Sequence, residues 1–381
     1  MPITYLILAK GAVSKHIENI RFISKLIKGR MNQNKPKPDI KDLTRKLLAH
    51  WFEQHGVRSF RADQVFKWLY LHQIDDFHQM TDLGKNTRDL LGQHFVSKRL
   101  KVKEIATSKD KTRKYLFELS DGSLIESVLI PEKQHHTLCI SSQVGCGQAC
   151  RFCLTARTGM IRNLTPGEII SQVRDICHIN AGSKSPTNIV FMGMGEPLAN
   201  YNNVIQALAV ITDSDAGLKF SNRRITLSTA GLVARMPDLG QDTQVNLAVS
   251  LNAVDNQTRS RLMPINRKYP IERLIAACRD YPLRNRKKIT IEYILMKGVN
   301  DSPEAAHTLA KLLKPLKAKI NLIPYNAYDG SPYACPSEDV ILNFQDILIA
   351  NHYTVMIRRS KGQDILAACG QLRASKSFHK T

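Results

Sequence analysis

The sequence contains no apolar run long enough to cross a membrane. A transmembrane helix needs about 20 consecutive apolar residues, and the apolar run nearest the start, ITYLILA, is far shorter. No cationic segment precedes that run, as a secretory signal peptide would require. We therefore expect neither membrane association nor export, and we place the protein in the cytoplasm. A monomer is a separate expectation.

Acidic residues are scarce relative to basic ones. The 381 residues include 55 Lys and Arg but only 33 Asp and Glu, which gives a formal net charge of +22. Such an excess indicates a polyanionic partner and favours nucleic acid over a membrane surface. The simpler alternative is a basic, well-solvated surface that has no such partner.

Cysteine is also sparse, with eight residues in the chain. In a long chain without a signal peptide, clustered thiols indicate metal binding or redox catalysis more often than structural disulfides. No second Cys-x2-Cys pair is present, although structural zinc sites usually need four ligands in two such pairs. The sequence also contains no internal repeat of fixed period.

The first hundred residues divide into an extension and a helical module. Residues 1–36 form a basic extension that ends in the breaker-rich NQNKPKP, and Met31 just before it offers an alternative translation start. Residues 37–97 contain apolar residues at three- and four-residue spacing, in DLTRKLLAHWFEQHG and RADQVFKWLYLHQ. This spacing is typical of amphipathic helices. We therefore predict a small helical accessory domain. The basic excess of the chain gives this domain an expected role in binding nucleic acid, RNA in particular.

The rest of the chain begins with a hairpin. Residues 98–136 contain two β-rich runs around Asp121-Gly122, the pattern of a β-hairpin that links the helical domain to the remainder of the chain. Residues 137–360 alternate strand-like and helical patterns, and residues 361–381 form a C-terminal tail.

The alternating region predicts an α/β fold. Between the strands, N-terminal capping residues indicate where helices begin. Thr165 and Glu168, for example, have the spacing of a capping box. Strands alternating with helices predict a parallel sheet, either open or curled into a full or partial barrel. In such folds the chemistry lies at the carboxyl ends of the strands. The strand-like runs are TLCISS, NIVFMG, RRITLST, VNLAVSL, KITIEYILM, KINLIP and YTVMIRR.

Three of the eight cysteines lie within eight residues, with the spacing Cys-x3-Cys-x2-Cys at Cys146, Cys150 and Cys153. The same spacing would place three sulfurs on one face of a helix. Gly145 and Gly147 flank the first cysteine, however, and favour a loop at the end of a strand. Three thiolates bound to a four-iron cluster leave one iron without a protein ligand, so that another molecule can bind there.

This motif resembles that of the radical S-adenosylmethionine (SAM) enzymes, in which the open iron binds SAM. Further segments resemble the rRNA adenine-C2 methyltransferases of that superfamily, and the resemblance spans residues 126–372. It implies a partial (β/α)6 barrel preceded by a small helical domain and a β-hairpin linker. The segments that carry it are TLCISSQVGC, FMGMGEPLANYNNV, RRITLSTAGL, SLNAVDNQTRSRLMPINRKYPI, KINLIPYN and DILAACGQL.

The resemblance also implies cofactors and their ligands. One [4Fe–4S] cluster is held by Cys146, Cys150 and Cys153, and two SAM molecules are used per turnover. Asn252 stands where the family usually has His. The implied SAM contacts are Gly195, Glu196, Ser228, Ser250, Leu251, Asn252 and Asn326.

The implied reaction depends on two further cysteines. Cys369 matches the residue that SAM methylates, and a SAM-derived radical then takes hydrogen from the new methyl group. After the carbon adds to adenine, Cys139 attacks the Cys369 sulfur and leaves a disulfide. Glu126 matches the proposed base, although an exposed strand carboxylate is the simpler interpretation. No role is implied for the remaining cysteines, Cys177, Cys278 and Cys335.

The implied substrates are 23S rRNA and tRNA, and the implied reductant is an electron donor such as flavodoxin. One alternative is a C8-adenine methyltransferase that uses the same two cysteines, but the sequence GEPLAN favours carbon 2. A second alternative is a non-catalytic iron–sulfur protein that binds RNA and senses redox state. Such a sensor would have no use for Cys139, Cys369 or the Gly195-Glu196 pair.

Overall fold

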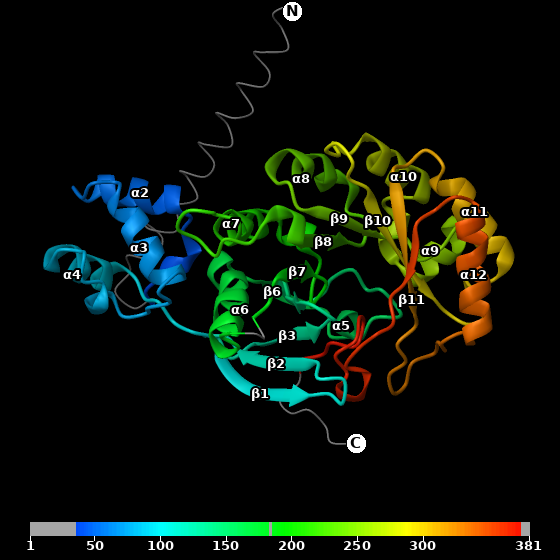
Figure 1. Ribbon diagram of the computed structural model, residues 1–381, viewed down its shortest axis with the longest axis horizontal. Coiled ribbons are helices and arrows are strands. Elements are labelled where there is room, and N and C mark those ends of the chain that lie inside the picture. The colour runs from blue at the N-terminus through cyan, green and yellow to red at the C-terminus, as the bar shows by residue number, and fades with distance from the viewer. Residues whose placement is uncertain (1–35, 183–184, 375–381) are drawn as a thin grey trace, which may run out of the picture. The chain divides into compact units, whose positions relative to one another are not determined.

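The computed structural model describes residues 36–182 and 185–374 (Figure 1). The predicted extension at residues 1–36 and the alternative start at Met31 lie almost wholly outside the described residues. The chain divides into two compact units, with the boundary between Lys98 and Arg99.

The first unit is helical, as the spacing of its apolar residues predicts. Its helices are α2 (Arg45–Gln54), α3 (Arg61–Tyr70) and α4 (Lys85–His94), with the short 3-10 turns η1 (Ile40–Asp42) and η2 (Phe77–Gln79). The hydroxyl of Thr44 caps α2 by accepting a hydrogen bond from the backbone N–H of Leu47. The helices enclose a shared apolar core that includes Leu48, Trp51, Phe52, Val65, Phe66, Leu69 and Leu91.

The second unit is built on one ten-stranded sheet with the order β1-β2-β3-β4-β7-β8-β9-β10-β11-β12. Neighbours from β1 to β4 are antiparallel, whereas those from β4 onward are parallel. Because β1 and β12 stay at opposite edges, the parallel part forms an open, partial barrel. The strands are β1 (Lys101–Thr107), β2 (Arg113–Glu118), β3 (Leu124–Pro131), β4 (His136–Cys139), β7 (Asn188–Phe191), β8 (Ile225–Thr229), β9 (Asn246–Ser250), β10 (Ile289–Leu295), β11 (Ala318–Pro324) and β12 (Val355–Ile357).

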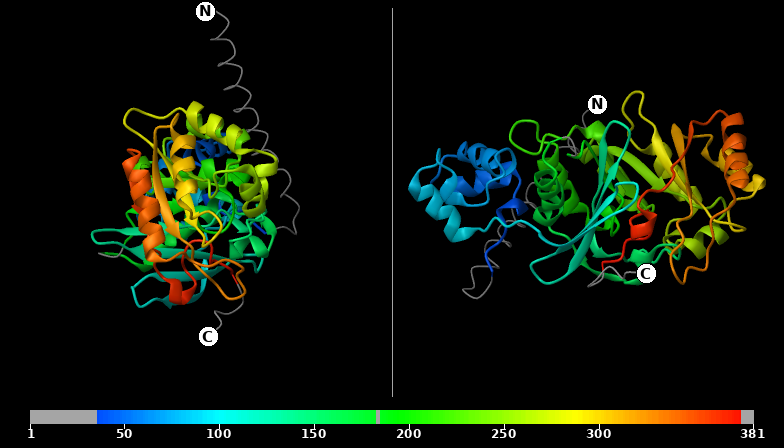
Figure 2. Two further views of the ribbon diagram at one scale, coloured as in Figure 1. Left: turned by 90° about the vertical axis from the view of Figure 1, so that its right-hand side faces the viewer. Right: turned by 60° about the horizontal axis from the view of Figure 1, so that its bottom comes forward.

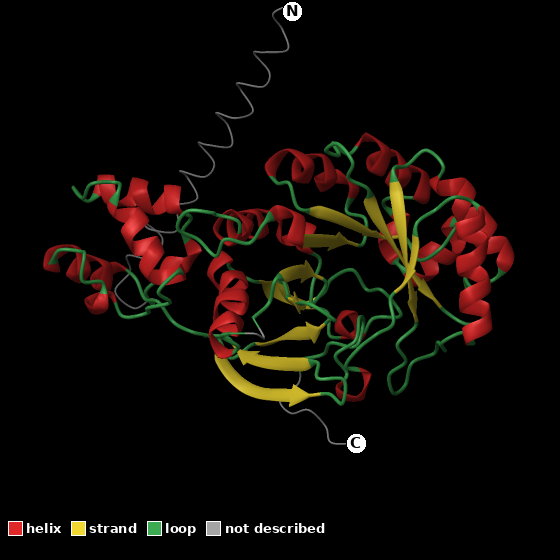
Figure 3. Cartoon of the chain, in the orientation of Figure 1, coloured by secondary structure: helices red, strands yellow, loops and turns green. Residues whose placement is uncertain are grey.

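Within the described residues, six strand–helix units precede the last strand, which confirms the predicted partial (β/α)6 barrel. The helices lie around the outside of the parallel strands (Figure 3). Thr165 and Glu168 form the predicted capping box at the start of the first of them. These helices are α6 (Pro166–Ile179), α7 (Tyr201–Ile211), α8 (Met236–Asp242), α10 (Ile271–Asp280), α11 (Pro303–Leu313) and α12 (Glu338–Ala350), and the short α9 (Asn256–Leu262) precedes α10.

The predicted hairpin is present and belongs to the same sheet as the barrel. Strands β2 and β3 pair in register around Asp121-Gly122, and Gly122 adopts the positive φ of 80° that the turn requires. Strand β3 then pairs with β4, the first barrel strand. Strand β1 is not evident from the sequence, because its residues KVKEIAT lie at an exposed sheet edge and are rich in charge.

No helix in the described part of the chain is both long enough and apolar enough to span a membrane.

Candidate active site

The three clustered cysteines lie in a loop, not on a helix. The loop follows β5 (Gln143–Gly145) and leads into α5 (Leu154–Arg157). Strand β5 pairs with β6 (Met160–Asn163) in a separate two-stranded sheet. Gly145 has φ 73°, and a Cβ atom there would lie 1.9 Å from the carbonyl oxygen of Gly159. Glycine is therefore required for the close approach that fixes the start of the loop.

The loop forms one wall of an open cavity at the carboxyl ends of the barrel strands. The cavity encloses about 800 Å³ including its open mouth. It brings together residues from β7, β8, β9 and the C-terminal tail that are far apart in sequence. The sequence-predicted site residues that line it are Cys146, Cys150, Cys153, Gly195, Glu196, Ser228, Ser250 and Cys369.

Glu196 is a buried carboxylate held by two backbone N–H groups. One oxygen accepts a hydrogen bond of 2.7 Å from Ala230, beyond β8, and the other accepts one of 3.0 Å from Leu198. Burial raises the pKa of Glu196, and these hydrogen bonds oppose the rise. The preceding Gly195 has φ 99°, and a Cβ atom there would lie 2.6 Å from the Cβ of Gln143. A side chain at position 195 would therefore collide with Gln143, whose side-chain oxygen accepts a hydrogen bond from the backbone N–H of Glu196.

Leu251, Asn252 and Asn326 do not line this cavity in the structure. Asn252 is buried with φ 59°, and its side-chain oxygen accepts a hydrogen bond of 2.8 Å from the backbone N–H of Ile294. Its backbone carbonyl accepts one from Asn300. Asn252 therefore joins the ends of β9 and β10, and its predicted contact with SAM stays a prediction.

Asn326 instead holds the tail. Its side-chain amide donates a hydrogen bond of 3.1 Å to the carbonyl oxygen of Cys369, and its oxygen accepts one of 2.9 Å from Gln363. The tail is tied to α5 as well, since Leu154 donates to the carbonyl of Gly370 at 2.7 Å. These contacts fix Cys369 beside the cysteine loop.

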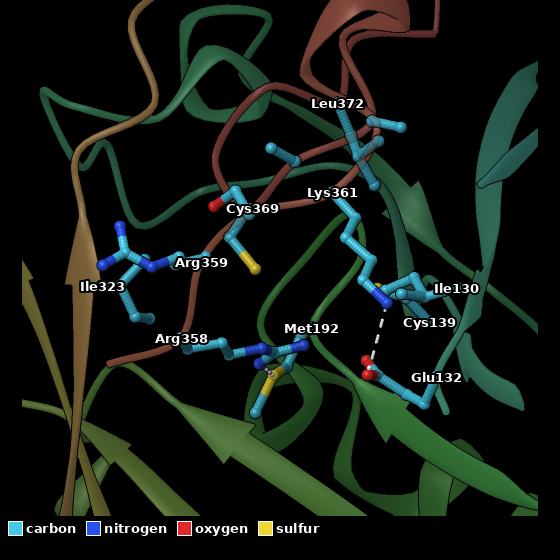
Figure 4. A pocket seen from close by; sticks show the side chains of 13 residues that line it. Ile130, Glu132, Cys139, Met192, Ile323, Arg358, Arg359, Lys361, Cys369 and Leu372 are labelled. Atoms are coloured by element: carbon cyan, nitrogen blue, oxygen red, sulfur yellow. Dashed lines mark hydrogen bonds and ion pairs between the residues drawn. The ribbon is translucent and has the colours of Figure 1, made fainter. Parts of the chain in front are cut away.

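The two lone cysteines share a second cavity, which adjoins the first. Both Cys139, at the end of β4, and Cys369 line it (Figure 4). Arg358 lies in the same cavity, and Lys361 pairs with Glu132 beside it at 3.3 Å. Because Cys369 lines both cavities, it stands where they meet. Burial raises the pKa of Cys139 to about 12.

Glu126 is fully buried, so the interpretation as an exposed strand carboxylate is wrong. Lys114 lies across the β2–β3 pair and forms an ion pair with Glu126 at 3.2 Å. The other carboxylate oxygen accepts a hydrogen bond of 2.8 Å from the backbone N–H of Arg373. Burial raises the pKa of Glu126, and Lys114 opposes the rise. Glu126 lines neither cavity, and its predicted role as a base stays a prediction.

Three charged residues of the site are not among the sequence-predicted ones. Glu292 lines the first cavity and Arg358 the second. A signal exists for Glu292, because it is a lone charge inside the apolar run KITIEYILM. Arg259 is fully buried and donates five hydrogen bonds, among them to the carbonyls of Ala230 and Ser250 at the first cavity. No helix or strand periodicity indicates such a hub, because four of its five acceptors are backbone carbonyls, which any residue type provides.

Comparison with known proteins identifies the family. Residues 38–96 match the family model described as the ribosomal RNA large subunit methyltransferase N-terminal domain, and residues 140–310 match the radical SAM superfamily. The chain is 57% identical to the dual-specificity RNA methyltransferase RlmN of Desulfosudis oleivorans, over 92% of this chain and 94% of that protein. The chain belongs to this radical SAM family of RNA methyltransferases.

Other relatives agree with this assignment. The chain is 51% identical to the protein of the same name from Geobacter sulfurreducens, over 88% of this chain and 92% of that protein. The crystal structure of a radical SAM methyltransferase from Sphaerobacter thermophilus is similar, with 41% identity and a TM-score of 0.83. The match covers 89% of this chain and all of that one.

The cysteine loop fits the iron–sulfur cluster that the radical SAM family implies. Among residues 36–182 and 185–374, no three Cys, His, Asp or Glu side chains are grouped as ligands of a single metal ion. The three cysteines nevertheless line one cavity, where burial and the charges of Cys153 and Cys146 raise the pKa of Cys150. Buried thiolates that repel one another need a cationic group between them, and the irons of a cluster supply that charge.

Proposed function

We propose that this protein methylates carbon 2 of an adenine in 23S rRNA and in tRNA, by a radical SAM mechanism in the cytoplasm. The observation that carries the proposal is the position of Cys369, which lines both the cavity with the cysteine loop and the cavity with Cys139. A methyl carrier must face the SAM site first and a second thiol later. A residue at the junction of two cavities meets both needs.

The proposed cofactor is one [4Fe–4S] cluster held by Cys146, Cys150 and Cys153, which when bound supplies the electron that cleaves SAM. Glu196 would attract the SAM ammonium group, since it is a buried carboxylate at the cavity edge. Two SAM molecules are used in each turnover, because one supplies the methyl group and the other the radical.

The two lone cysteines carry the methyl group and release the product. The Cys369 sulfur accepts the methyl group of one SAM, and the radical derived from the second SAM takes a hydrogen atom from that methyl group. The resulting carbon bonds to carbon 2 of adenine and links the protein to the RNA. The Cys139 sulfur then attacks that of Cys369, breaks the link and leaves a disulfide, which must be reduced for the next turnover. The buried thiol of Cys139 has a pKa of about 12, so its proton must leave during this step. Glu126 is the proposed base for the proton on carbon 2.

The basic surface supports an RNA substrate. With a net charge of +22, the protein can neutralise many phosphates. The second cavity adds Arg358, Arg359 and Lys361 close to Cys369. We propose that the target adenine enters unstacked beside these cations. A flavodoxin-like protein is the proposed electron donor, and the enzyme is proposed to act as a monomer.

The test is anaerobic reconstitution of the cluster, followed by reaction with fragments of 23S rRNA and with tRNA. Mass spectrometry of the nucleosides should show 2-methyladenosine. The appearance of 8-methyladenosine alone would instead identify the enzyme as a C8 methyltransferase. No methylation by the intact, reduced protein would favour the redox-sensor alternative.

The cysteine mechanism is tested with matched variants. Cys369→Ala should abolish methylation, whereas Cys335→Ala should leave it unchanged, because Cys335 is exposed and lines neither cavity. Methylation that persists in the Cys369 variant would rule out the proposed methyl carrier.

A further inference from the structure

The first cavity contains a buried carboxylate that the proposed function does not use. Glu292, on β10, lines the cavity and is only 4% exposed. One of its oxygens, Oε1, accepts a hydrogen bond of 3.0 Å from the side-chain amide of Asn321. Within the described residues the other oxygen, Oε2, has no hydrogen-bond partner. Buried acceptors without a donor are rare in native proteins, and each one needs an explanation. Because Glu292 also lines a cavity, a molecule bound there can supply the missing donor.

A second unpaired acceptor lies in the same group. Residues Glu292 and Asn321 are direct neighbours in the parallel β10–β11 register. The side-chain oxygen of Asn321 is also buried and lacks a partner in the described part of the chain. The pair therefore contains one satisfied hydrogen bond and two unsatisfied oxygens. Both of these oxygens could accept a hydrogen bond from a bound molecule that carries N–H or O–H groups.

Other groups of the protein do not satisfy Glu292. In the described residues it takes part in no ion pair within 4.0 Å. Burial raises the pKa of Glu292, and the positive charge of Arg358 opposes the rise without contact between the two side chains. Asn321 holds Oε1 in place, so the carboxylate cannot turn freely. Its neighbour in the β9–β10 register is Ser250, which lines the same cavity.

We propose that Glu292, oriented by Asn321, is a binding residue whose Oε2 accepts a hydrogen bond from an N–H or O–H group of a molecule in the first cavity. This inference rests on the proposed function, which brings two molecules with such donors. SAM carries the hydroxyl groups of its ribose, and the target adenine carries an exocyclic amino group. Both present a donor to the same acceptor, and the experiment distinguishes them.

The experiment uses the full chain with its cluster reconstituted, and compares Glu292→Gln and Glu292→Leu with Thr290→Val. Thr290 is a buried residue of β10 that does not line the cavity, so its variant controls for repacking of the strand. The first readout is SAM affinity, measured by equilibrium dialysis without RNA. The second is kcat/KM for two RNA fragments, one with adenine at the target position and one with purine, which lacks the amino group.

If SAM supplies the donor, both Glu292 variants should weaken SAM binding roughly 10- to 100-fold, as expected for a hydrogen bond to a charged group. If the target base supplies it, SAM binding should stay unchanged, and the preference for adenine over purine should fall by a similar factor. The control should resemble the wild type in both assays. Glu292→Gln has nearly the same shape as the native residue and keeps the test valid should the Leu variant fold poorly.

Unchanged SAM affinity together with an unchanged preference for adenine would overturn the inference, because ordinary water would then complete the site. Equal losses in the Thr290 control would overturn it as well, by showing a general effect on the strand. The SAM-binding assay needs no RNA. A wild-type protein that binds SAM but does not methylate RNA would therefore contradict the proposed function while leaving this assay decisive for Glu292.

Discussion

The side-chain amide of Asn326 donates a 3.1 Å hydrogen bond to the carbonyl oxygen of Cys369, the proposed methyl carrier. Its side-chain oxygen also accepts a hydrogen bond from Gln363, at the start of the same tail. A single residue at the end of β11 therefore holds the tail at two points. The tail lies beside the strands of the β2–β3 hairpin as well, as its red segment in Figure 2 shows.

Replacing Asn326 should loosen the tail. Each of its two hydrogen bonds contributes about 1 kcal/mol. Asn326→Ala should therefore speed amide hydrogen exchange in residues 363–372 roughly 30-fold, the factor that corresponds to about 2 kcal/mol. Methyl transfer to Cys369 should slow as well. Hydrogen exchange measured by mass spectrometry checks the first effect. Asn351→Ala is the control, because Asn351 is exposed at the end of α12. Equal exchange in both variants would show that Asn326 does not hold the tail.

Replacement of Arg259 should destabilise the fold even when the new residue is lysine. Its guanidinium donates five hydrogen bonds, which reach the carbonyls at the ends of β8 and β9 and the side chain of Asn266. Lysine keeps the charge but has no planar fork of donors. Arg259→Lys should therefore lower the free energy of unfolding by about 3 kcal/mol. The melting temperature measures this loss, and Arg261→Lys, on the exposed side of the same helix, should leave it unchanged. A melting temperature equal to that of the wild type would contradict the hub assignment.

Two aspartates tie the tail to the turn between β1 and β2. Asp110 accepts a hydrogen bond of 2.7 Å from the backbone N–H of Gly362, and Asp364 accepts one of 2.6 Å from the hydroxyl of Ser108. Burial raises the pKa of Asp110, but hydrogen bonds from Thr112, Gly362 and Ser108 outweigh this and lower its pKa. Hydrogen bonds from Ser108 and Lys109 lower the pKa of Asp364.

Because of these pKa shifts, the stability that Asp110 and Asp364 contribute to the fold should depend on pH. A carboxylate whose pKa is lowered by folding stabilises the fold above its unfolded pKa of about 3.9, and loses that effect as the pH falls through its folded pKa. Asp110→Asn should therefore reduce stability at pH 7, and the difference from the wild type should shrink below pH 4. Thermal unfolding at several pH values checks this. If the difference in thermal stability between the variant and the wild type stayed constant down to pH 2, the charge of Asp110 would not contribute to stability.

The sequence predicts the elements of the fold well, because each barrel strand is a short apolar run and each helix has a clear apolar face. The loop conformation of the three cysteines follows from the glycines beside them. Strand β1 escapes prediction because an exposed edge needs no apolar pattern.

Contacts between distant residues of the site could not be predicted. Asn326 matches a SAM contact in sequence, yet its amide here holds the tail. The burial of Glu126 depends on Lys114 across the hairpin and on the backbone of Arg373, which is 247 residues away in sequence. Local patterns report which face of an element is apolar, but not which distant group a buried charge meets.

The proposed catalytic Cys139 and the exposed Cys335 should differ sharply in reactivity toward iodoacetamide. Cys139 is 7% exposed, and burial raises the pKa of its thiol to about 12. At pH 8 only about 1 in 10,000 of its molecules would then be the reactive thiolate. Peptide mass spectrometry should find Cys139 unmodified in the folded protein and fully modified after denaturation. The exposed Cys335 is the internal control and should react before unfolding. Equal labelling rates for Cys139 and Cys335 in the folded protein would show that the Cys139 thiol is accessible. Burial would then not prevent the loss of its proton when Cys139 attacks Cys369.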